Sequence, residues 1–227
     1  MKSLQQHISQ VKTLHSLNEF ISEKLVINKD FERNNYFVYK TDETKSIKIF
    51  SNRWPQFNEY RDKVYINGKN VKLDNEGSTH EEYRPGEYEI NITDIDNITD
   101  CNAMFYACYN LTEVPLFDTR NVKNMGSMFQ ACHNLTEVPL FDTRNVIYMD
   151  WMFSACNKLT TVPLFDTRNV KDMNAMFANC KNLTKVPLFN TRNVNIMINM
   201  FANCNNLNKQ TIQEWSKIYD FNSQNKI

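Results

Sequence analysis

The sequence predicts an α/β solenoid built from 24-residue units, and three observations lead to this fold class. The segment LTEVPLFDTRNV at 111–122 returns unchanged at 135–146, and close variants begin at residues 159 and 183. A fixed period of this length is typical of proteins whose repeats stack on one another. Each unit also shows a strand-like apolar spacing followed by a helix-like one. We therefore expect a stacked array over residues 93–207.

The first half of each unit is predicted to form a strand. In the first complete unit, Leu111, Val114 and Leu116 follow the L-x-x-L-x-L spacing of a leucine-rich-repeat strand. We expect all three side chains to point into the core. Neighbouring strands of a sheet lie about 4.8 Å apart, so each inward position would become a row of side chains along the array.

The second half of each unit is predicted to form a short helix. Its apolar residues recur at three- and four-residue steps, which is the spacing of a single buried helix face. In the first complete unit these residues are Val122, Met125, Met128, Phe129 and Cys132. Met, Phe and Cys recur at the last three places in the following units, so we expect three buried rows.

The first 30 residues are predicted to form an amphipathic helix. Apolar residues recur there three or four apart, which places them in one stripe. A stripe of this length must be buried against the rest of the chain, against a second copy of the chain, or against another protein. If the helix serves assembly, the residues that carry the contact are Leu4, Ile8, Val11, Leu14, Ile21 and Leu25.

Two further segments flank the array. Residues 31–92 alternate between apolar and polar residues and predict a small β-rich module. Its clearest element is a hairpin that turns at Asn67 and Gly68, because both residue types tolerate the positive φ of a type I′ turn. Residues 208–227 predict a C-terminal helix that covers the open end of the array, as terminal caps of stacked repeats do.

Charge and hydropathy exclude several classes of function. The 26 basic and 26 acidic residues balance, and no basic cluster stands out, so we expect no nucleic-acid partner. No apolar run approaches the roughly 20 residues of a membrane span, and the N-terminus lacks the apolar core of a signal peptide. We therefore expect no membrane insertion and a cytoplasmic or virion-associated protein, with surface display only by a route without a signal peptide.

No arrangement of residues predicts catalysis. The four histidines are scattered, and the four glycines build no phosphate-binding loop. Five of the six cysteines recur once per unit, without the C-x-x-C pairs that usually hold a metal. We interpret them as buried free thiols, which suits a reducing compartment. We expect no enzyme activity and no cofactor.

Two rows of side chains are the candidate partner-binding residues. The aromatic row faces outward if the strand continues past Leu116, and is part of the core if the chain turns there. The basic row, with an acidic row beside it, either faces a partner or stabilises one repeat against the next. The candidates are Phe117, Phe141, Phe165, Phe189, Arg120, Arg144, Arg168 and Arg192.

The unit NLTEVPLFDTRNVKNMGSMFQAC resembles the BspA-like leucine-rich repeats, in particular the branch found in surface proteins of mycoplasmas and gut Bacteroidales. The resemblance covers about residues 92–207. It implies a leucine-rich-repeat fold and a role in binding proteins at surfaces, including adhesion. The family pattern supplies no catalytic residue.

The segment SLNEFISEKL is similar to the leader helices of internal head proteins of large tailed phages. Leu17 to Glu19 and Ile21 to Glu23 fit the L/I-x-E sites of prohead proteases.

From the repeat resemblance, we expect a non-enzymatic protein-binding or adhesion protein. The resemblance at the N-terminus gives the alternative, a structural virion component assembled through its N-terminus. Glycan binding, with Phe117 and its equivalents as stacking platforms, is a third hypothesis.

Overall fold

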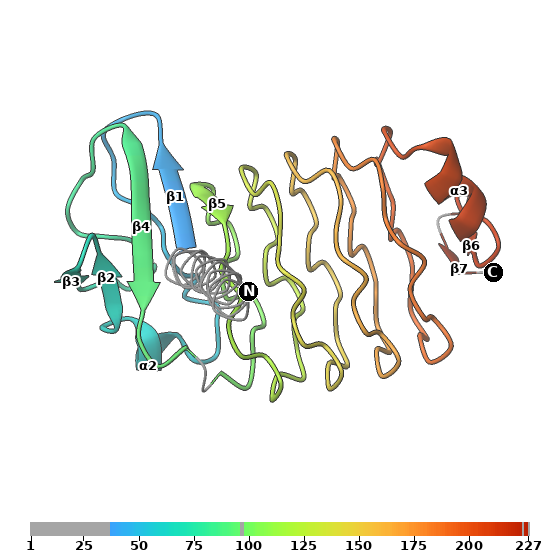
Figure 1. Cartoon of the computed structure of the whole chain (residues 1–227), viewed down its shortest axis with the longest axis horizontal. Helices are drawn as coiled ribbons and strands as arrows, with labels where there is room; N and C mark the ends of the chain where they lie inside the picture. The colour runs from blue at the N-terminus through green and yellow to red at the C-terminus, as the bar shows by residue number, and fades with distance from the viewer. Residues whose placement is uncertain (1–36, 96–97, 224, 227) are drawn as a thin grey trace, which may run out of the picture. The chain divides into compact units, whose positions relative to one another are not determined.

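The computed structural model describes residues 37–95, 98–223 and 225–226. Most of the regular structure lies in the first part of this range (Figure 1). The named elements are β1 (Phe37–Thr41), α2 (Phe57–Tyr60), β2 (Val64–Ile66), β3 (Lys69–Val71), β4 (Gly86–Ile92), β5 (Leu111–Glu113), α3 (Lys209–Trp215), β6 (Tyr219–Asp220) and β7 (Asn225–Lys226). The predicted assembly helix lies outside the described residues.

The predicted fold class, an α/β solenoid with a strand and a helix in every unit and a C-terminal capping helix, is wrong. Within the described residues, the regular structure is a five-stranded antiparallel sheet, a two-residue β-ladder and two short helices. The repeats contain no helix, and β5 in the first unit is their only named strand. The helix predicted over 208–227 is limited to α3, and turns and a two-stranded ladder follow it.

The sheet has the strand order β3-β2-β4-β1-β5. The predicted hairpin is confirmed: β2 pairs with β3 in antiparallel register, and the turn residues Asn67 and Gly68 have φ values of 49° and 78°. The edge strand β5 pairs with β1, with Val38 opposite Glu113. The sheet therefore includes a strand from the first repeat.

The segment predicted as a helix is instead a chain of tight turns. Two residues in it, Ser127 and Ala131 in the first complete unit, have φ values of 53° and 62°, which an α-helix cannot contain. Met128 N–H bonds back three residues to the Met125 carbonyl, whereas Phe129 N–H bonds forward to Met152 of the next repeat. Every second N–H is thus used between repeats, which explains how helix-like apolar spacing arises without a helix.

Successive repeats lie side by side (Figure 1). Isolated parallel bridges join Asn124 to Tyr148, Tyr148 to Asp172 and Asp172 to Ile196. The Phe129 and Phe153 rings of neighbouring repeats stack at 5.7 Å. Neighbouring repeats are therefore joined by both backbone hydrogen bonds and aromatic stacking.

Candidate functional site

The chain makes a sharp turn after the proline of each central repeat. Phe141 N–H bonds to the Pro139 carbonyl at 3.0 Å, and Phe165 N–H bonds to the Pro163 carbonyl at 3.1 Å. A hydrogen bond across three residues is the mark of a γ-turn, with Leu140 or Leu164 at its apex. The leucine side chain is therefore directed outward, and the following phenylalanine takes the buried place.

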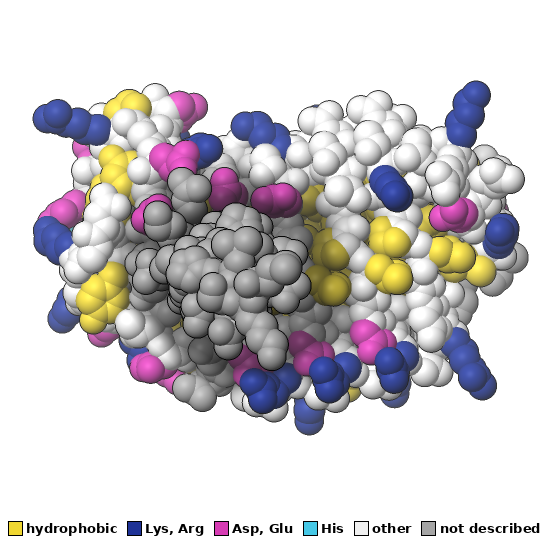
Figure 2. Space-filling model, in the orientation of Figure 1, with side chains coloured by type: hydrophobic (Ala, Val, Ile, Leu, Met, Phe, Trp, Pro, Cys, Tyr) yellow, Lys and Arg dark blue, Asp and Glu magenta, His cyan; other side chains and the backbone are white. Residues whose placement is uncertain are grey.

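This turn corrects the predicted strand pattern, in which Leu116 and its equivalents pointed into the core. Leu116 is 58% exposed, Leu140 59%, Leu164 61% and Leu188 41%. We call these four residues the leucine strip. Figure 2 shows hydrophobic side chains gathered on this view of the repeats, with acidic and basic side chains along a margin. Four aligned exposed leucines are unusual, since single exposed apolar residues are the norm on a soluble surface.

The aromatic row is buried. Phe117, Phe141, Phe165 and Phe189 are between 2% and 6% exposed. Their rings contact the second phenylalanine row, as Phe141 does with Phe129 at a centroid distance of 6.2 Å. The sequence left open whether this row faces outward or belongs to the core, and the structure places all four rings in the core.

The basic row is exposed and paired. Nε of Arg120 lies 2.7 Å from a carboxylate oxygen of Asp118, and the arginine is 69% exposed. The same pairing joins Asp142 to Arg144 and Asp166 to Arg168, each at 2.9 Å. We call these pairs the Asp–Arg row. In the last repeat Asn190 replaces the aspartate, and its side-chain oxygen accepts the backbone N–H of Arg192 at 3.1 Å.

The arginine pairing affects the acidic residues of this row. Hydrogen bonding to Arg120 lowers the pKa of Asp118, and hydrogen bonding to Arg168 lowers the pKa of Asp166. A lowered folded-state pKa contributes stability above the unfolded value, near 3.9, that is lost as the pH falls through the folded value. Because the pairs are exposed, this contribution is small.

The remaining residues of the FDTRNV segment join one repeat to the next. The buried Thr143 hydroxyl donates to the Asp166 carbonyl of the following repeat at 3.0 Å. Nδ2 of Asn169 donates to the Arg144 carbonyl of the preceding repeat at 2.7 Å. Threonine and asparagine are therefore structural here, which leaves arginine, and the leucine that precedes the segment, as the side chains that extend farthest into solvent.

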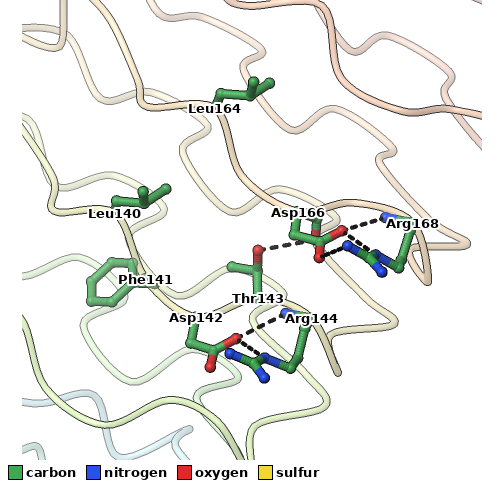
Figure 3. Close-up of a pocket in the computed structure, with 8 residues that line it drawn as sticks. All are labelled: Leu140, Phe141, Asp142, Thr143, Arg144, Leu164, Asp166 and Arg168. Carbon is green, nitrogen blue, oxygen red and sulfur yellow. Dashed lines mark hydrogen bonds and ion pairs between the residues drawn. The ribbon is translucent and has the colours of Figure 1, made fainter.

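A groove of about 480 Å³ runs between two central repeats, with the leucine strip on one side and the Asp–Arg row on the other. Figure 3 shows Leu140 and Leu164 side by side, and the Asp142–Arg144 and Asp166–Arg168 pairs next to each other across the groove. Sequence reasoning found the arginines and missed the leucines. The Pro-Leu-Phe triplet could have indicated that either the leucine or the phenylalanine is exposed, because two adjacent apolar residues cannot both point inward on an extended chain.

The described residues contain no group of three or more His, Cys, Asp or Glu side chains that could hold a metal ion. All six cysteines are free and buried. No helix among the described residues is both long and apolar enough to cross a membrane. The leucine strip, which recurs in all four complete repeats, and its charged margin are the candidate site.

The fold and the surface together define a repeat protein with a regularly patterned face. The family described as "Mycoplasma protein of unknown function, DUF285" matches residues 79–185 and 159–223, which is more than half of the chain. The chain belongs to this family, which is part of the BspA-like repeat group. No curated protein and no solved structure matches the chain.

Proposed function

We propose that the protein is a protein-binding module and that the leucine strip, with the Asp–Arg row beside it, is its binding surface. The observation that carries this proposal is the alignment of four exposed leucines, each 41–61% exposed, at one position of the repeat. Exposed apolar rows bordered by polar groups are typical of protein interaction sites.

The charged side chains beside the leucine strip also support the proposal that this surface binds a protein. In the first three repeats the exposed arginine is held by an aspartate of its own repeat, as in the 2.9 Å contact between Arg144 and Asp142. A guanidinium group carries five N–H donors, and one that an aspartate already orders needs little further ordering when it binds a partner's carboxylates or carbonyls. The apolar strip would supply affinity, and the charged margin would supply orientation.

The test is the double substitution Leu140→Glu with Leu164→Glu. Both leucines are about 60% exposed, so the variant should fold, while charge in the middle of the strip should remove binding. Proteins retained by the immobilised wild-type chain and by the variant would be compared by quantitative mass spectrometry. The matched control is Ile196→Glu with Ile198→Glu, at exposed isoleucines outside the strip. The proposal fails if no retained protein depends on the strip.

An assembly role for the first 30 residues remains a separate prediction that rests on their apolar stripe, and the phage origin remains one that rests on the resemblance of SLNEFISEKL to phage leader helices. Deleting residues 1–30 should abolish assembly into larger particles and leave a folded chain. Light scattering of the two chains measures this directly. If the full chain and the shortened chain have the same size, these residues do not drive self-assembly.

A further inference from the structure

The charge on the candidate surface changes sign along the repeats. One exposed position beside the leucine strip holds Glu113, Glu137, Thr161 and Lys185 in successive repeats. Glu113 lies near Lys40, but Lys40 pairs with Glu87 at 2.9 Å, so this end stays acidic.

The Asp–Arg row at the margin of the strip also becomes more basic toward the last repeat. The first three repeats each hold a neutral Asp–Arg pair, whereas the last holds Asn190 and Arg192. The surface is therefore acidic at the repeat nearest the sheet and basic at the repeat nearest α3. The apolar strip between these ends is uniform, because leucine occupies its position in every repeat.

A surface with this pattern is complementary to itself when one copy is reversed. We propose that two copies of the chain pair through the leucine strip, face to face and antiparallel, about a two-fold axis that crosses the strip midway between Leu140 and Leu164. This inference rests on the proposed role of the strip as a protein-binding surface, and it names a second copy as the partner. A two-fold interface uses the same surface on both chains, which is the commonest arrangement in homodimers.

The two-fold axis defines the contacts. Leu140 faces Leu164 of the other copy, and Leu116 faces Leu188. Glu113 of each copy faces Lys185 of the other, so the pairing gains two ion pairs. Arg192, whose repeat lacks the aspartate, meets the Asp118–Arg120 pair. A parallel arrangement would lose this match, because it places the Glu113-to-Lys185 column opposite the Asp–Arg row.

The dimer is expected to be weak. Rings of successive repeats lie 5.6–5.7 Å apart, so four repeats make a strip on the order of 15–20 Å long. A strip of this length is too short to bury the area of a standard specific interface, which places the pairing among weak, transient contacts. We expect a dissociation constant of micromolar order, which analytical ultracentrifugation of the full chain over a concentration series would measure.

A charge exchange tests the antiparallel geometry. Glu113→Lys alone and Lys185→Glu alone each place like charges opposite one another, and each should weaken dimerisation by about tenfold. Mixing the two variants should restore dimerisation, because in the mixed dimer lysines of one chain face glutamates of the other. Leu140→Glu with Leu164→Glu should abolish the dimer in every combination, and Ile196→Glu with Ile198→Glu should leave it unchanged.

Three results would overturn the inference. A full chain that stays monomeric at all concentrations would show that the strip does not bind a second copy. A dimer that none of the strip and charge variants affects would place the interface elsewhere. A mixture that dimerises no better than its components would rule out the antiparallel geometry. In each case, strip-dependent retention of another protein would leave the proposed function intact.

Discussion

At the scale of single residues, backbone conformation decides what each repeat can tolerate. Two positions per repeat lie in the left-handed region, and most of them hold alanine, serine or asparagine. Trp151, with a φ of 56°, is the exception. A bulky residue is rare in this region because its Cβ approaches the backbone carbonyl too closely. Asn199 occupies the equivalent position two repeats later with a φ of 55°, which shows the residue type that the backbone favours.

This strain predicts a difference between two substitutions at the same site. Trp151→Asn should be more stable than Trp151→Ala by about 1 kcal/mol, since both remove the indole but only asparagine tolerates the left-handed region well. Urea unfolding followed by fluorescence of the remaining tryptophans measures the free energy of unfolding of each variant. Equal stability of the two variants would mean that residue 151 relaxes out of this conformation.

At the scale of the repeat element, the cysteine row is part of the hydrogen-bond pattern. Sγ of Cys132 lies 3.0 Å from the Phe105 carbonyl, and Sγ of Cys156 lies 3.1 Å from the Phe129 carbonyl. Burial raises the pKa of Cys108 to about 12 and raises the pKa of Cys132 well above its usual value. These thiols act as buried donors between repeats and are protonated at neutral pH.

Thiol reactivity should therefore report on the folded array. At pH 8 the native protein should react with a disulfide reagent far more slowly than the unfolded chain, in which all six cysteines should react. The reaction would be followed by absorbance with and without urea. Fast modification of the native protein at one or more cysteines would contradict the buried arrangement.

The burial of the cysteine row predicts how a cysteine-to-serine substitution changes the stability of the protein. Cys156→Ser keeps a donor of similar size, but it places a more polar hydroxyl among methionine and phenylalanine side chains. We expect it to lower the free energy of unfolding by about 1–3 kcal/mol. Thermal unfolding of the variant measures this loss, and Ser154→Ala, at a neighbouring buried serine, serves as the comparison. A variant as stable as the wild type would show that a hydroxyl can replace the thiol at this buried position without loss of stability.

At the scale of the whole molecule, the sheet and the repeats share one core. The ring of Phe37 on β1 contacts Phe105 at 5.1 Å and Phe117 at 6.1 Å. Sγ of Cys108 bonds to the Ile49 carbonyl at 3.4 Å. At the other end of the array, Trp215 of α3 packs edge-on against Phe201 at 5.1 Å. The buried cluster therefore runs without a break from the sheet to α3.

A continuous core predicts cooperative unfolding. Phe37→Ala removes a ring that is 1% exposed and should cost about 3–5 kcal/mol. Because Phe37 lies between the sheet and the first repeat, circular dichroism and thiol exposure should report a single transition in both the wild type and the variant. Two separate transitions would mean that the sheet and the repeats unfold independently.

The sequence by itself determined the period, the rows and the hairpin. Identical spacing of Met, Phe and Cys required that these residues stack, and the Asn67–Gly68 pair specified a hairpin, since few residue types accept two successive positive φ angles. The arginine row was also visible, because a charge repeated at a fixed interval must lie on the surface.

Only the tertiary structure decided which apolar residues face out and how the repeats are built. Three- and four-residue spacing fits both a helix and a chain of turns, and the difference lies in hydrogen bonds between repeats that no local pattern contains. In the same way, the Pro-Leu-Phe triplet leaves open which apolar residue is buried. The turn at Leu140 places Phe141 against Phe129, so packing with other repeats puts phenylalanine in the core and leucine on the surface.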